Sequence, residues 1–583
     1  MRIPSCRLRL AGTALVVCGF FACASTYRPF PLRAPLRQDG DLRPVAVHCR
    51  TESTKNDPHH VSCAPEEYES PIIWDGADNM VFRPLAESLG VIAQTEAANV
   101  NSFDEVPDSA WFTNRPSSRP VSIEELRLGA CAPAQILEPD TAADGSWVID
   151  KGKANGSTAG FRVSIPGKGK YLFKAEEPDQ PERPSAASVI GAAVYGTAGF
   201  NTSCEQIVYF KPSLLTLTPG LRSKGNFSAP TDFDRQALDK VLADCPHRDG
   251  LVRMQASAWL PGYLIGAFRY EGTRGDDPSD VVAHQNRREL RGGRLLAAWI
   301  DHHDAREQNT MDSWIAESKD PPDSSPGRVV HYYLDTSECL GSEWQWDEVS
   351  RRLGHSYIVD WGDLAADFVT LGIPVRPWDR VKHQPGLEIF GYFDVENFDP
   401  EGWKNEYANP AFSRMTERDG AWMARVLARF TPAMVKTLAE MGQFTNPAWT
   451  AYLAEVLEGR LERILNRYLT RLSPIAELHV EGTEKLCGID VAEARAVREP
   501  DRFQYGARLV GGGEAPVTKL DGGRICAALP HVAPDGGSAD GAPERYVRVR
   551  IDDGVAKGPL IAHLYDLGPT RGYVLVGVER PEE

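Results

Sequence analysis

The sequence predicts an α+β fold in which an antiparallel sheet and a helical body form two lobes, followed by a small β-sandwich-like domain. Short apolar runs between Gly-rich turns fill residues 141–270, which is typical of a strand meander. Long helical periods dominate residues 271–474. From 475 to 583 short strands alternate with Gly- and Asp-rich loops, which favours a separate β domain.

Residues 1–24 have the basic start, apolar run and small-residue exit of a secretory signal peptide. The exit has two interpretations. Cleavage before Cys23 would leave that cysteine for lipid attachment, as in a bacterial lipoprotein, and the chain would be anchored in the cell envelope. Cleavage after Ala24 would release a secreted protein. The apolar run is shorter than the ~20 residues that a membrane-spanning helix needs. We expect the lipid-anchored form.

The formal net charge of −17 indicates an acidic surface. Acidic proteins repel phosphate backbones, so a nucleic-acid partner is not expected. The same charge argues against electrostatic binding to anionic lipid. We therefore expect contact with the membrane through a lipid anchor only.

Of the 11 cysteines, Cys6 and Cys18 lie in the signal and Cys23 is the expected lipid site, which leaves an even number for disulfides. The local pairs are Cys49 with Cys63 and Cys487 with Cys526. The alternative is that several are small buried apolar residues. A zinc site built from Cys49, His59, His60 and Cys63 is a weaker alternative, because the spacing fits no compact finger.

Residues 25–70 are rich in Pro, Arg and Asp and predict a flexible tether. Residues 71–140 predict an irregular extension whose aromatic side chains pack on the following core. Residues 141–270 then show the order β-β-β-α-β. The predicted elements are strands at 147–149, 161–165 and 170–175, a small-residue helix at 185–199 and a strand at 205–210.

In the second lobe, residues 287–300 predict a basic helix with an apolar face. Its arginines predict a solvated, ion-paired face, or else contact with an acidic partner or a phosphate. Residues 340–472 are expected to be mostly helical. The strongest periods lie at 419–430, 432–443 and 449–472.

One motif carries chemistry. His302, Asp304 and Asn309 form the pattern H-x-D-x-x-x-x-N, and Asp335 ends the apolar run 329–335. Phosphoryl transfer uses such a set: one carboxylate orients the attacking hydroxyl, while an amide oxygen and a second carboxylate hold metal ions on the phosphates. The adjacent histidines and aspartate could instead ligate a transition metal, but that interpretation leaves Asn309 and Asp335 unexplained.

Residues before this motif supply the matching phosphate contacts. Lys174 lies in an apolar strand, where an ammonium group neutralises phosphates or else reaches water at a sheet edge. Gly152, Gly156 and Gly160 lie between two strands at a spacing of four. Glycines there let backbone N–H groups approach phosphates, although an ordinary flexible hairpin has the same composition.

With these residues in place, the chain resembles the protein-kinase-like superfamily, especially its HipA-like and CotH-like bacterial branches. It also resembles a group of exported bacterial lipoproteins that share the motifs at Asp104–Arg115 and Arg287–Gly292. The resemblance covers roughly residues 100–472.

The resemblance implies a role for each residue of the motif. Lys174 and the three glycines would bind ATP or another nucleotide. Asp304 would be the catalytic aspartate, with His302 bracing the loop. Asn309 and Asp335 would hold Mg²⁺ or Mn²⁺.

The chain also departs from the kinase pattern. Thr336 and Ser337 replace the usual Phe-Gly after the metal-binding aspartate. Ser188 lies where the small-residue helix should carry a glutamate to pair with Lys174. The glutamates at 176, 182 and 205 remain as alternatives.

Two functions follow. The first is an exported phosphotransferase that moves a phosphoryl or nucleotidyl group from a metal-bound nucleotide to a hydroxyl of a protein or glycan. The second is a non-catalytic envelope lipoprotein that binds a partner or glycan through the same fold and the β domain. The cell envelope offers no standing supply of ATP, which favours the second. The complete set of four motif residues favours the first.

Overall fold

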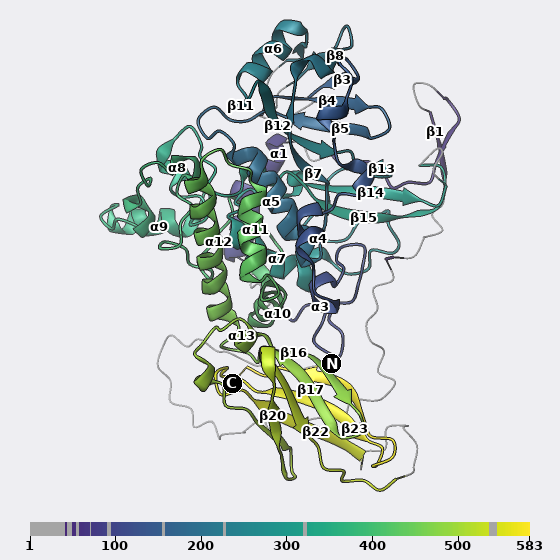
Figure 1. Ribbon diagram of the computed structural model, residues 1–583, viewed down its shortest axis with the longest axis vertical. Coiled ribbons are helices and arrows are strands. Elements are labelled where there is room, and N and C mark those ends of the chain that lie inside the picture. Colours follow the sequence, from purple (N-terminus) through teal and green to yellow (C-terminus); the bar gives the residue numbers. More distant parts are fainter. Residues whose placement is uncertain are drawn as a thin grey trace.

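The computed structural model describes residues 41–42, 49–53, 57–69, 72–89, 95–153, 158–224, 229–318, 323–535 and 545–582. It is a mixed α and β structure with several sheets (Figure 1). This confirms the mixed class that the sequence predicts. In the described part of the chain, none of the helices combines the length and apolarity that crossing a bilayer requires. The signal peptide and Cys23 lie outside the described residues.

A seven-stranded sheet occupies one end of the molecule (Figure 1). Its strands run in the order β11-β12-β5-β4-β3-β8, and β7 also pairs with β12. Their bounds are β3 (Trp147–Gly152), β4 (Gly160–Ile165), β5 (Gly169–Lys174), β7 (Glu205–Phe210), β8 (Leu215–Leu217), β11 (His247–Arg248) and β12 (Leu251–Ala258). The first three follow the predicted meander, because apolar residues alternate along them and one face enters a core around Phe161 and Phe173.

Helix α5 (Arg183–Ala198) lies between this sheet and the rest of the molecule and contacts β7 and β12. It starts two residues before the predicted position, with Pro184 in its first turn. Nearly all of its residues are buried, which explains its composition of Ala, Ser and Gly. Small side chains let neighbouring backbone approach the helix from several sides.

A second sheet joins four strands in the order β13-β14-β15-β6. The bounds are β6 (Asn201–Thr202), β13 (Tyr263–Leu264), β14 (Thr310–Ala316) and β15 (Gly327–Tyr333). Strands β14 and β15 form a hairpin. Strand β6 follows α5 directly and pairs in parallel with β15. This connection ties α5 to the strand that precedes Asp335.

Four long helices form the body below: α7 (Arg288–Ile300), α10 (Glu417–Leu427), α11 (Pro432–Met441) and α12 (Pro447–Tyr468). They overlap the predicted helical periods, and α10 and α12 each begin two residues earlier than predicted. Thr416 and Asp419 close a capping box at the start of α10. The apolar sides meet in one large core that includes Trp299, Trp422 and Phe430.

The expectation that residues 340–472 are mostly helical is wrong for the first half of that range. Helices α8 (Asp347–Ser350) and α9 (Trp361–Thr370) are followed by an irregular stretch, 371–416, that contains only short 3-10 turns among its described residues. Prolines at 374, 377, 385, 400 and 410 explain the difference, because proline removes a backbone donor and restricts the residue before it.

The C-terminal part contains two further antiparallel sheets (Figure 1). One has the order β16-β17-β21-β20 and the other β19-β18-β22-β23-β24. The bounds are β16 (Ile475–Glu481), β17 (Lys485–Asp490), β18 (Gly506–Leu509), β19 (Glu514–Ala515), β20 (Val517–Lys519), β21 (Arg524–Ala528), β22 (Tyr546–Asp552), β23 (Leu560–Asp566) and β24 (Tyr573–Glu579). Apolar residues of both sheets share one core, including Leu486 and Ile525 from one and Val549 and Ala562 from the other.

Three disulfides join Cys49 to Cys63, Cys131 to Cys204 and Cys487 to Cys526. The first and third are the predicted local pairs. The second links residues 73 apart in sequence and was not predicted. Because Cys49 and Cys63 bond to each other, and His60 pairs with Asp323 at 2.6 Å, the alternative zinc site is excluded.

The N-terminal segments are more regular than their composition predicts. The expected tether contains a hairpin of β1 (Arg50–Glu52) and β2 (His60–Ser62). The expected irregular extension contains α1 (Ile72–Ala77), the π-helix η1 (Asp78–Phe82), α2 (Arg83–Leu89), α3 (Arg115–Ser118) and α4 (Ile123–Leu128). Trp111 and Phe112 from this extension are 2 % and 0 % exposed and lie in the main core.

Candidate functional site

The turn after α7 contains Asp304 and Asn309. Asp301 ends the helix in a left-handed conformation, with φ 54°. The Asn309 side-chain amide donates to the Asp304 carbonyl oxygen at 2.8 Å and to its Oδ2 at 2.5 Å. The Leu334 backbone N–H donates to the Asn309 carbonyl at 2.9 Å. These bonds hold the turn against the end of β15, one residue before Asp335.

Lys174 and Asp335 meet across the two sheets. Lys174 Nζ donates to Asp335 Oδ1 at 2.5 Å, and the Ser337 hydroxyl donates to the same oxygen at 2.8 Å. The turn after Asp335 packs on α5. A Cβ at Gly191 would lie 2.5 Å from the Thr336 side chain, so glycine there permits this close approach. The small-residue helix therefore positions Asp335 beside the lysine.

The two charges stabilise each other. Burial acts to lower the pKa of Lys174, which is 7 % exposed, but the charge and hydrogen bond of Asp335, followed by the charge of Glu205, raise it. Burial acts to raise the pKa of Asp335, yet Lys174 outweighs burial and holds that pKa well below its usual range. Both groups are ionised at neutral pH.

Asp304 is in the opposite electrostatic state. Burial, followed by the charges of Glu338 and Glu406, raises its pKa well above the ordinary value, and Arg306 opposes this shift only in part. These surroundings therefore favour the protonated carboxyl over the carboxylate. Within the described residues Asp304 Oδ1 has no hydrogen-bond partner, and His302 Nε2 lies 3.3 Å from it.

His302 is neutral and fixed. Its Nδ1 lies 3.0 Å from the Tyr195 hydroxyl on α5, and the ring is fully buried. Burial, followed by the charge of His303, lowers its pKa to about 3. The ring therefore carries no charge at physiological pH and positions the turn.

The glycines between β3 and β4 have a packing role. A Cβ at Gly152 would lie 2.5 Å from the Arg222 carbonyl oxygen, and one at Gly160 would lie 2.4 Å from that of Phe173. Close backbone approach accounts for both residues. Gly156 lies outside the described residues.

Lys153 is a site residue that the sequence did not single out. Its Nζ donates to the Thr158 carbonyl at 2.6 Å. Burial, followed by the charge of Lys174, lowers its pKa to about 8. Its place within the Gly-rich stretch is a signal that could have identified it.

Two acidic residues near Asp304 were also missed. Glu338 ends the 3-10 turn Thr336–Glu338 that directly follows Asp335, and its charge acts on both Lys174 and Asp304. Glu406 forms an ion pair with Arg306 at 2.9 Å, and burial raises its pKa to about 7. The spacing of Glu338 could have revealed it. Glu406 is distant in sequence and gave no signal.

The three alternative glutamates have different partners. Glu176 is buried against Arg253 at 3.2 Å. Glu182 accepts from the Thr445 backbone N–H at 2.8 Å. Only Glu205 among the three has a charge that acts on Lys174. The direct contact of the lysine in the described residues is with Asp335.

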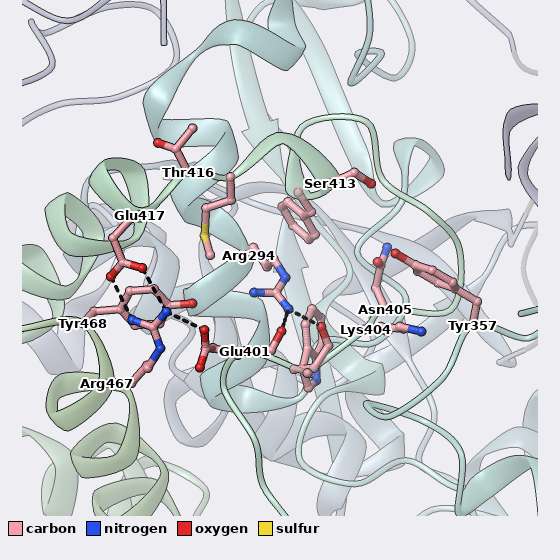
Figure 2. Close-up of a pocket in the computed structure, with 14 residues that line it drawn as sticks. Arg294, Tyr357, Glu401, Lys404, Asn405, Ser413, Thr416, Glu417, Arg467 and Tyr468 are labelled. Atoms are coloured by element: carbon pink, nitrogen blue, oxygen red, sulfur yellow. Dashed lines mark hydrogen bonds and ion pairs between the residues drawn. The ribbon is translucent and has the colours of Figure 1, made fainter. Parts of the chain in front are cut away.

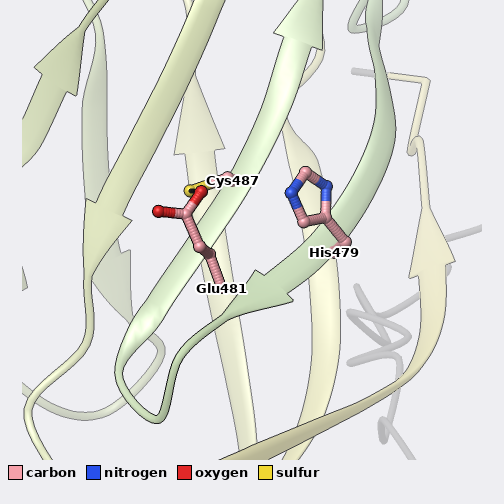
Figure 3. Close-up of side chains that lie close together, drawn as sticks. All are labelled: His479, Glu481 and Cys487. Atoms are coloured by element: carbon pink, nitrogen blue, oxygen red, sulfur yellow. Dashed lines mark hydrogen bonds between the residues drawn. The ribbon is translucent and has the colours of Figure 1, made fainter.

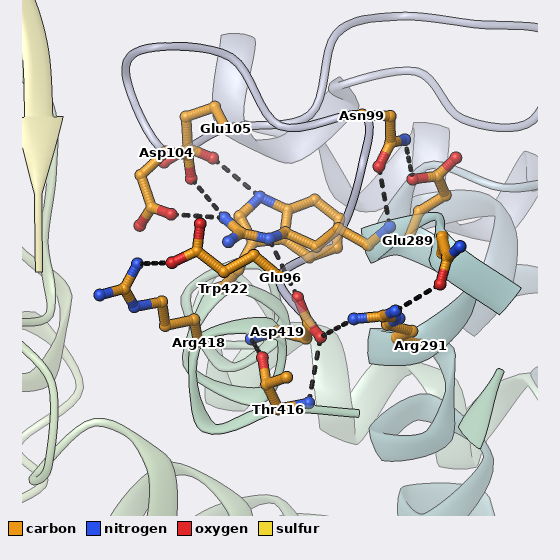
Figure 4. A network of polar contacts seen from close by, with 12 residues as sticks. Glu96, Asn99, Asp104, Glu105, Glu289, Arg291, Thr416, Arg418, Asp419 and Trp422 are labelled. Atoms are coloured by element: carbon orange, nitrogen blue, oxygen red, sulfur yellow. Dashed lines mark hydrogen bonds and ion pairs between the residues drawn. The ribbon is translucent and has the colours of Figure 1, made fainter. Parts of the chain in front are cut away.

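The motifs at Asp104–Arg115 and Arg287–Gly292 meet in a buried polar network (Figure 4). Asp104 Oδ1 accepts from Arg288 at 2.6 Å and its Oδ2 accepts from Arg580 at 2.6 Å, while Arg425 lies at 3.5 Å. Arg288 also contacts Asp419 at 3.2 Å. Burial acts to raise the pKa of Asp104, but the arginines hold it well below its usual range.

The predicted face of the 287–300 helix is therefore ion-paired, as expected, but it is buried rather than solvated. Arg287, Arg288 and Arg291 are at most 2 % exposed. The Asn99 side chain donates to Glu289 at 2.6 Å in the same network (Figure 4). Arginine can enter a protein interior when carboxylates and carbonyls satisfy its donors, so these motifs are structural.

A cavity of about 510 Å³ opens between α7, α10, α12 and the loop at 401–405 (Figure 2). Arg467 forms an ion pair with Glu417 at 2.8 Å. Arg294 donates to the Glu401 and Trp403 carbonyls at 2.6 Å each. Because its arginines already have partners, the cavity shows no uncompensated charge that would define a ligand.

Among the described residues, one group of three potential metal ligands has donor atoms within 4.8 Å of one another: His479, Glu481 and Cys487 (Figure 3). Cys487 is bonded to Cys526, so its sulfur is not a thiolate. The His302–His303 pair and Asp304 form no such group, which argues against the transition-metal alternative.

No protein-family model matches the chain, and no curated protein matches it. Among solved structures it is similar to the Helicobacter pylori proinflammatory kinase CtkA, with 9 % identity and a TM-score of 0.28. The match covers 57 % of this chain and 96 % of that chain. At this score the likeness carries no argument about what the chain does.

Proposed function

We propose that the chain is an exported kinase-like phosphotransferase that moves a phosphoryl or nucleotidyl group from a metal-bound nucleotide to a hydroxyl. The observation that carries the proposal is the 2.5 Å ion pair between Lys174 and Asp335, which are 161 residues apart in sequence. Kinases bring a strand lysine and a metal-binding aspartate to the same phosphates. The hydrogen bond between Asn309 and Asp304 holds the adjoining turn in place.

In this proposal the seven-stranded sheet with α5 is the N-terminal lobe, and α7, α10, α11 and α12 form the C-terminal lobe. The two C-terminal sheets form a β-sandwich-like domain. The order of elements supports this division, because a strand meander, one helix and one further strand precede the helical body.

The donor set fits a divalent metal. The Asp335 side chain is 41 % exposed, and its Oδ2 has no hydrogen-bond partner in the described part of the chain. Asp304 Oδ1 is buried and has no hydrogen-bond partner among the residues that the structure describes. Carboxylate and amide oxygens are the ligands that Mg²⁺ and Mn²⁺ prefer. Asp335 and Asn309 would hold the ion, which would neutralise charge on the phosphates.

The protein residues have separate roles in transfer. Lys174 binds phosphate oxygens, and Lys153 adds a second cation beside it. Asp304 orients the attacking hydroxyl and accepts its proton once its own carboxyl is ionised. Neutral His302 holds the turn through Tyr195. The acceptor is a hydroxyl of a protein or a glycan.

A second function is favoured by one observation. Helix α5 contains no glutamate: Ser188 occupies the expected position, and its buried hydroxyl has no hydrogen-bond partner within the described residues. The lysine instead contacts Asp335 directly. A chain that cannot assemble the usual ion pair could bind a partner or glycan without catalysis, anchored in the envelope through Cys23.

Thermal unfolding separates the two functions, because a ligand stabilises the fold in proportion to its affinity. The chain is heated with a non-hydrolysable ATP analogue and Mg²⁺ or Mn²⁺. We expect a metal-dependent rise in melting temperature that Asp335→Ala abolishes relative to its own ligand-free value. The exposed Asp521→Ala is the matched control and retains the rise. No shift with any nucleotide would overturn the phosphotransferase proposal.

A further inference from the structure

Helix α9 presents its polar side to the protein. Arg376 Nη1 lies 2.9 Å from Asp363 Oδ2, and its Nη2 lies 2.8 Å from Asp367 Oδ1. The Ser356 hydroxyl also donates to Asp363 at 2.7 Å. These contacts fix the rotation of the helix, so the acidic stripe faces inward.

The apolar side of α9 consequently faces solvent. None of its residues is buried. Leu364 and Phe368, one turn apart, are 50 % and 84 % exposed. The loop that follows continues the surface with Leu371 at 84 % and Ile373 at 78 % exposure. An amphipathic helix normally buries this side, and a continuous exposed apolar patch marks an interaction surface.

The patch extends to the α1–α2 segment. The Trp361 indole N–H donates to the Met80 carbonyl at 3.3 Å. In that segment Trp74 stacks on Phe82, with 5.7 Å between ring centroids, and the two are 58 % and 53 % exposed. Leu89 is 86 % exposed. Figure 1 shows α9 standing out from the body at the left edge of the molecule.

We propose that this apolar surface inserts into the interface of a lipid bilayer, in addition to any lipid anchor. Because the apolar tip protrudes, it can reach a flat membrane before the rest of the protein contacts the lipid. Segments that bind at the membrane interface combine aliphatic and aromatic side chains with flanking cations. Arg380 and Lys382 are exposed beside the patch. Because the chain is acidic overall, apolar insertion rather than charge provides the attraction.

The length of chain before the fold supports a bilayer as the occupant. Cys23 is the expected lipid site, and Asp41, the first described residue, accepts a hydrogen bond from the Ala110 backbone N–H at 2.9 Å. The 18 residue steps from Cys23 to Asp41 span at most about 60 Å. An anchored protein would therefore keep α9 at a high effective concentration near the same membrane, where weak insertion is sufficient.

Hydrogen exchange tests the proposal. The chain isolated from cells that express the complete sequence is mixed with vesicles of phosphatidylethanolamine and phosphatidylglycerol. We expect amides in 361–375 to exchange about tenfold more slowly with vesicles, a protection of about 1.4 kcal/mol. The double variant Phe368→Ser with Leu371→Ser loses this protection. Val281→Ser, at a position 74 % exposed elsewhere, retains it.

Three results would overturn the proposal. Unchanged exchange at 361–375 with vesicles would exclude insertion, even if the chain floats with them through its N-terminus. Protection that appears without vesicles and increases with protein concentration would identify a second copy of the chain as the occupant. Protection retained in the double variant would place the contact elsewhere. No nucleotide is present, so these outcomes do not depend on the proposed phosphotransfer.

Discussion

Lys174 and Asp335 form one ion pair but differ in exposure: the lysine side chain is 7 % exposed and the aspartate 41 %. Asp335→Asn leaves an ammonium group buried without its counter-charge. We expect this change to lower the free energy of unfolding by about 3 kcal/mol. Lys174→Met leaves a partly solvated carboxylate and should cost about 1 kcal/mol. Urea unfolding of both variants measures the difference.

The double variant serves as the control for this asymmetry. Removal of both charges leaves neither unpaired, so its stability should exceed that of Asp335→Asn alone. If the two single variants lose the same free energy of unfolding, the lysine depends on the ion pair no more than the aspartate does.

Asp304 allows a variant that separates binding from chemistry. Because burial favours the uncharged form of the Asp304 carboxyl, the uncharged amide in Asp304→Asn has a similar shape and suits the same surroundings. We expect the fold and nucleotide-induced stabilisation to remain and phosphotransfer to fall by roughly 100- to 10,000-fold. Radiolabel transfer and thermal unfolding on the same sample measure both. Full activity in this variant would remove Asp304 from the catalytic step.

The site residues differ in how far the sequence could identify them. Asp304 and Asn309 are five residues apart, so their hydrogen bond follows from a local turn that spacing can indicate. The Lys174–Asp335 pair required knowledge of a family pattern. Glu406 reaches the site only through the irregular stretch 371–416, and no local signal encodes such a path.

At the scale of elements, the short helix α13 (Val491–Ala494) follows Asp490, whose carboxyl has a raised pKa. Asp490 accepts from the Ala492 and Glu493 backbone N–H groups at 2.9 and 3.0 Å. It is fully buried, and burial followed by the charge of Asp553 raises its pKa from 3.8 to about 7. The folded state therefore retains a proton that the unfolded chain has already lost above about pH 4.

The sign of the pH dependence follows from this shift. The contribution of Asp490 to stability is fully present below the unfolded pKa and is lost as pH rises to about 7. Asp490→Asn keeps an acceptor for the helix start and does not titrate. Between pH 4 and pH 7 the wild type should lose up to about 4 kcal/mol relative to this variant. Calorimetry of both proteins across that range measures the difference. If the free energy of unfolding changes equally with pH in both proteins, the raised pKa of Asp490 is contradicted.

Elements with a strong local pattern match the prediction from the sequence. Elements whose structure depends on tertiary contacts do not match it. Strands β3, β4 and β5 and helix α12 follow alternation and helical periods. The stretch 371–416 falls in the range expected to be mostly helical, but its prolines prevent long helices there. The acidic side of α9 faces Arg376, and helical periodicity alone does not reveal this contact.

For the whole molecule, the contacts of Asp104 join three parts of the chain. Arg288 belongs to α7, Arg425 to α10, and Arg580 follows the last strand of the β domain. The Val578 backbone N–H also donates to the Ser102 carbonyl at 2.8 Å. We expect the helical body and the β domain to unfold together in the wild type.

Arg580→Met should separate these transitions. It removes one of three cations from a buried carboxylate and is expected to cost about 3 kcal/mol. Calorimetry should show a distinct β-domain transition below that of the body. Arg548→Met, on the half-exposed side of β22, is the control and should leave a single transition. A single transition in Arg580→Met would show that the shared contacts do not couple the two parts.

The position of Arg580 also determines when folding can finish. A ribosome adds Asp104 to the chain 476 residues before Arg580. During synthesis the carboxylate has two of its arginines at most until Arg580 has left the ribosome. A nascent chain that stops before Arg580 therefore cannot complete this network. Co-translational folding is expected to stabilise the helical body fully only after the C-terminal strands have been made.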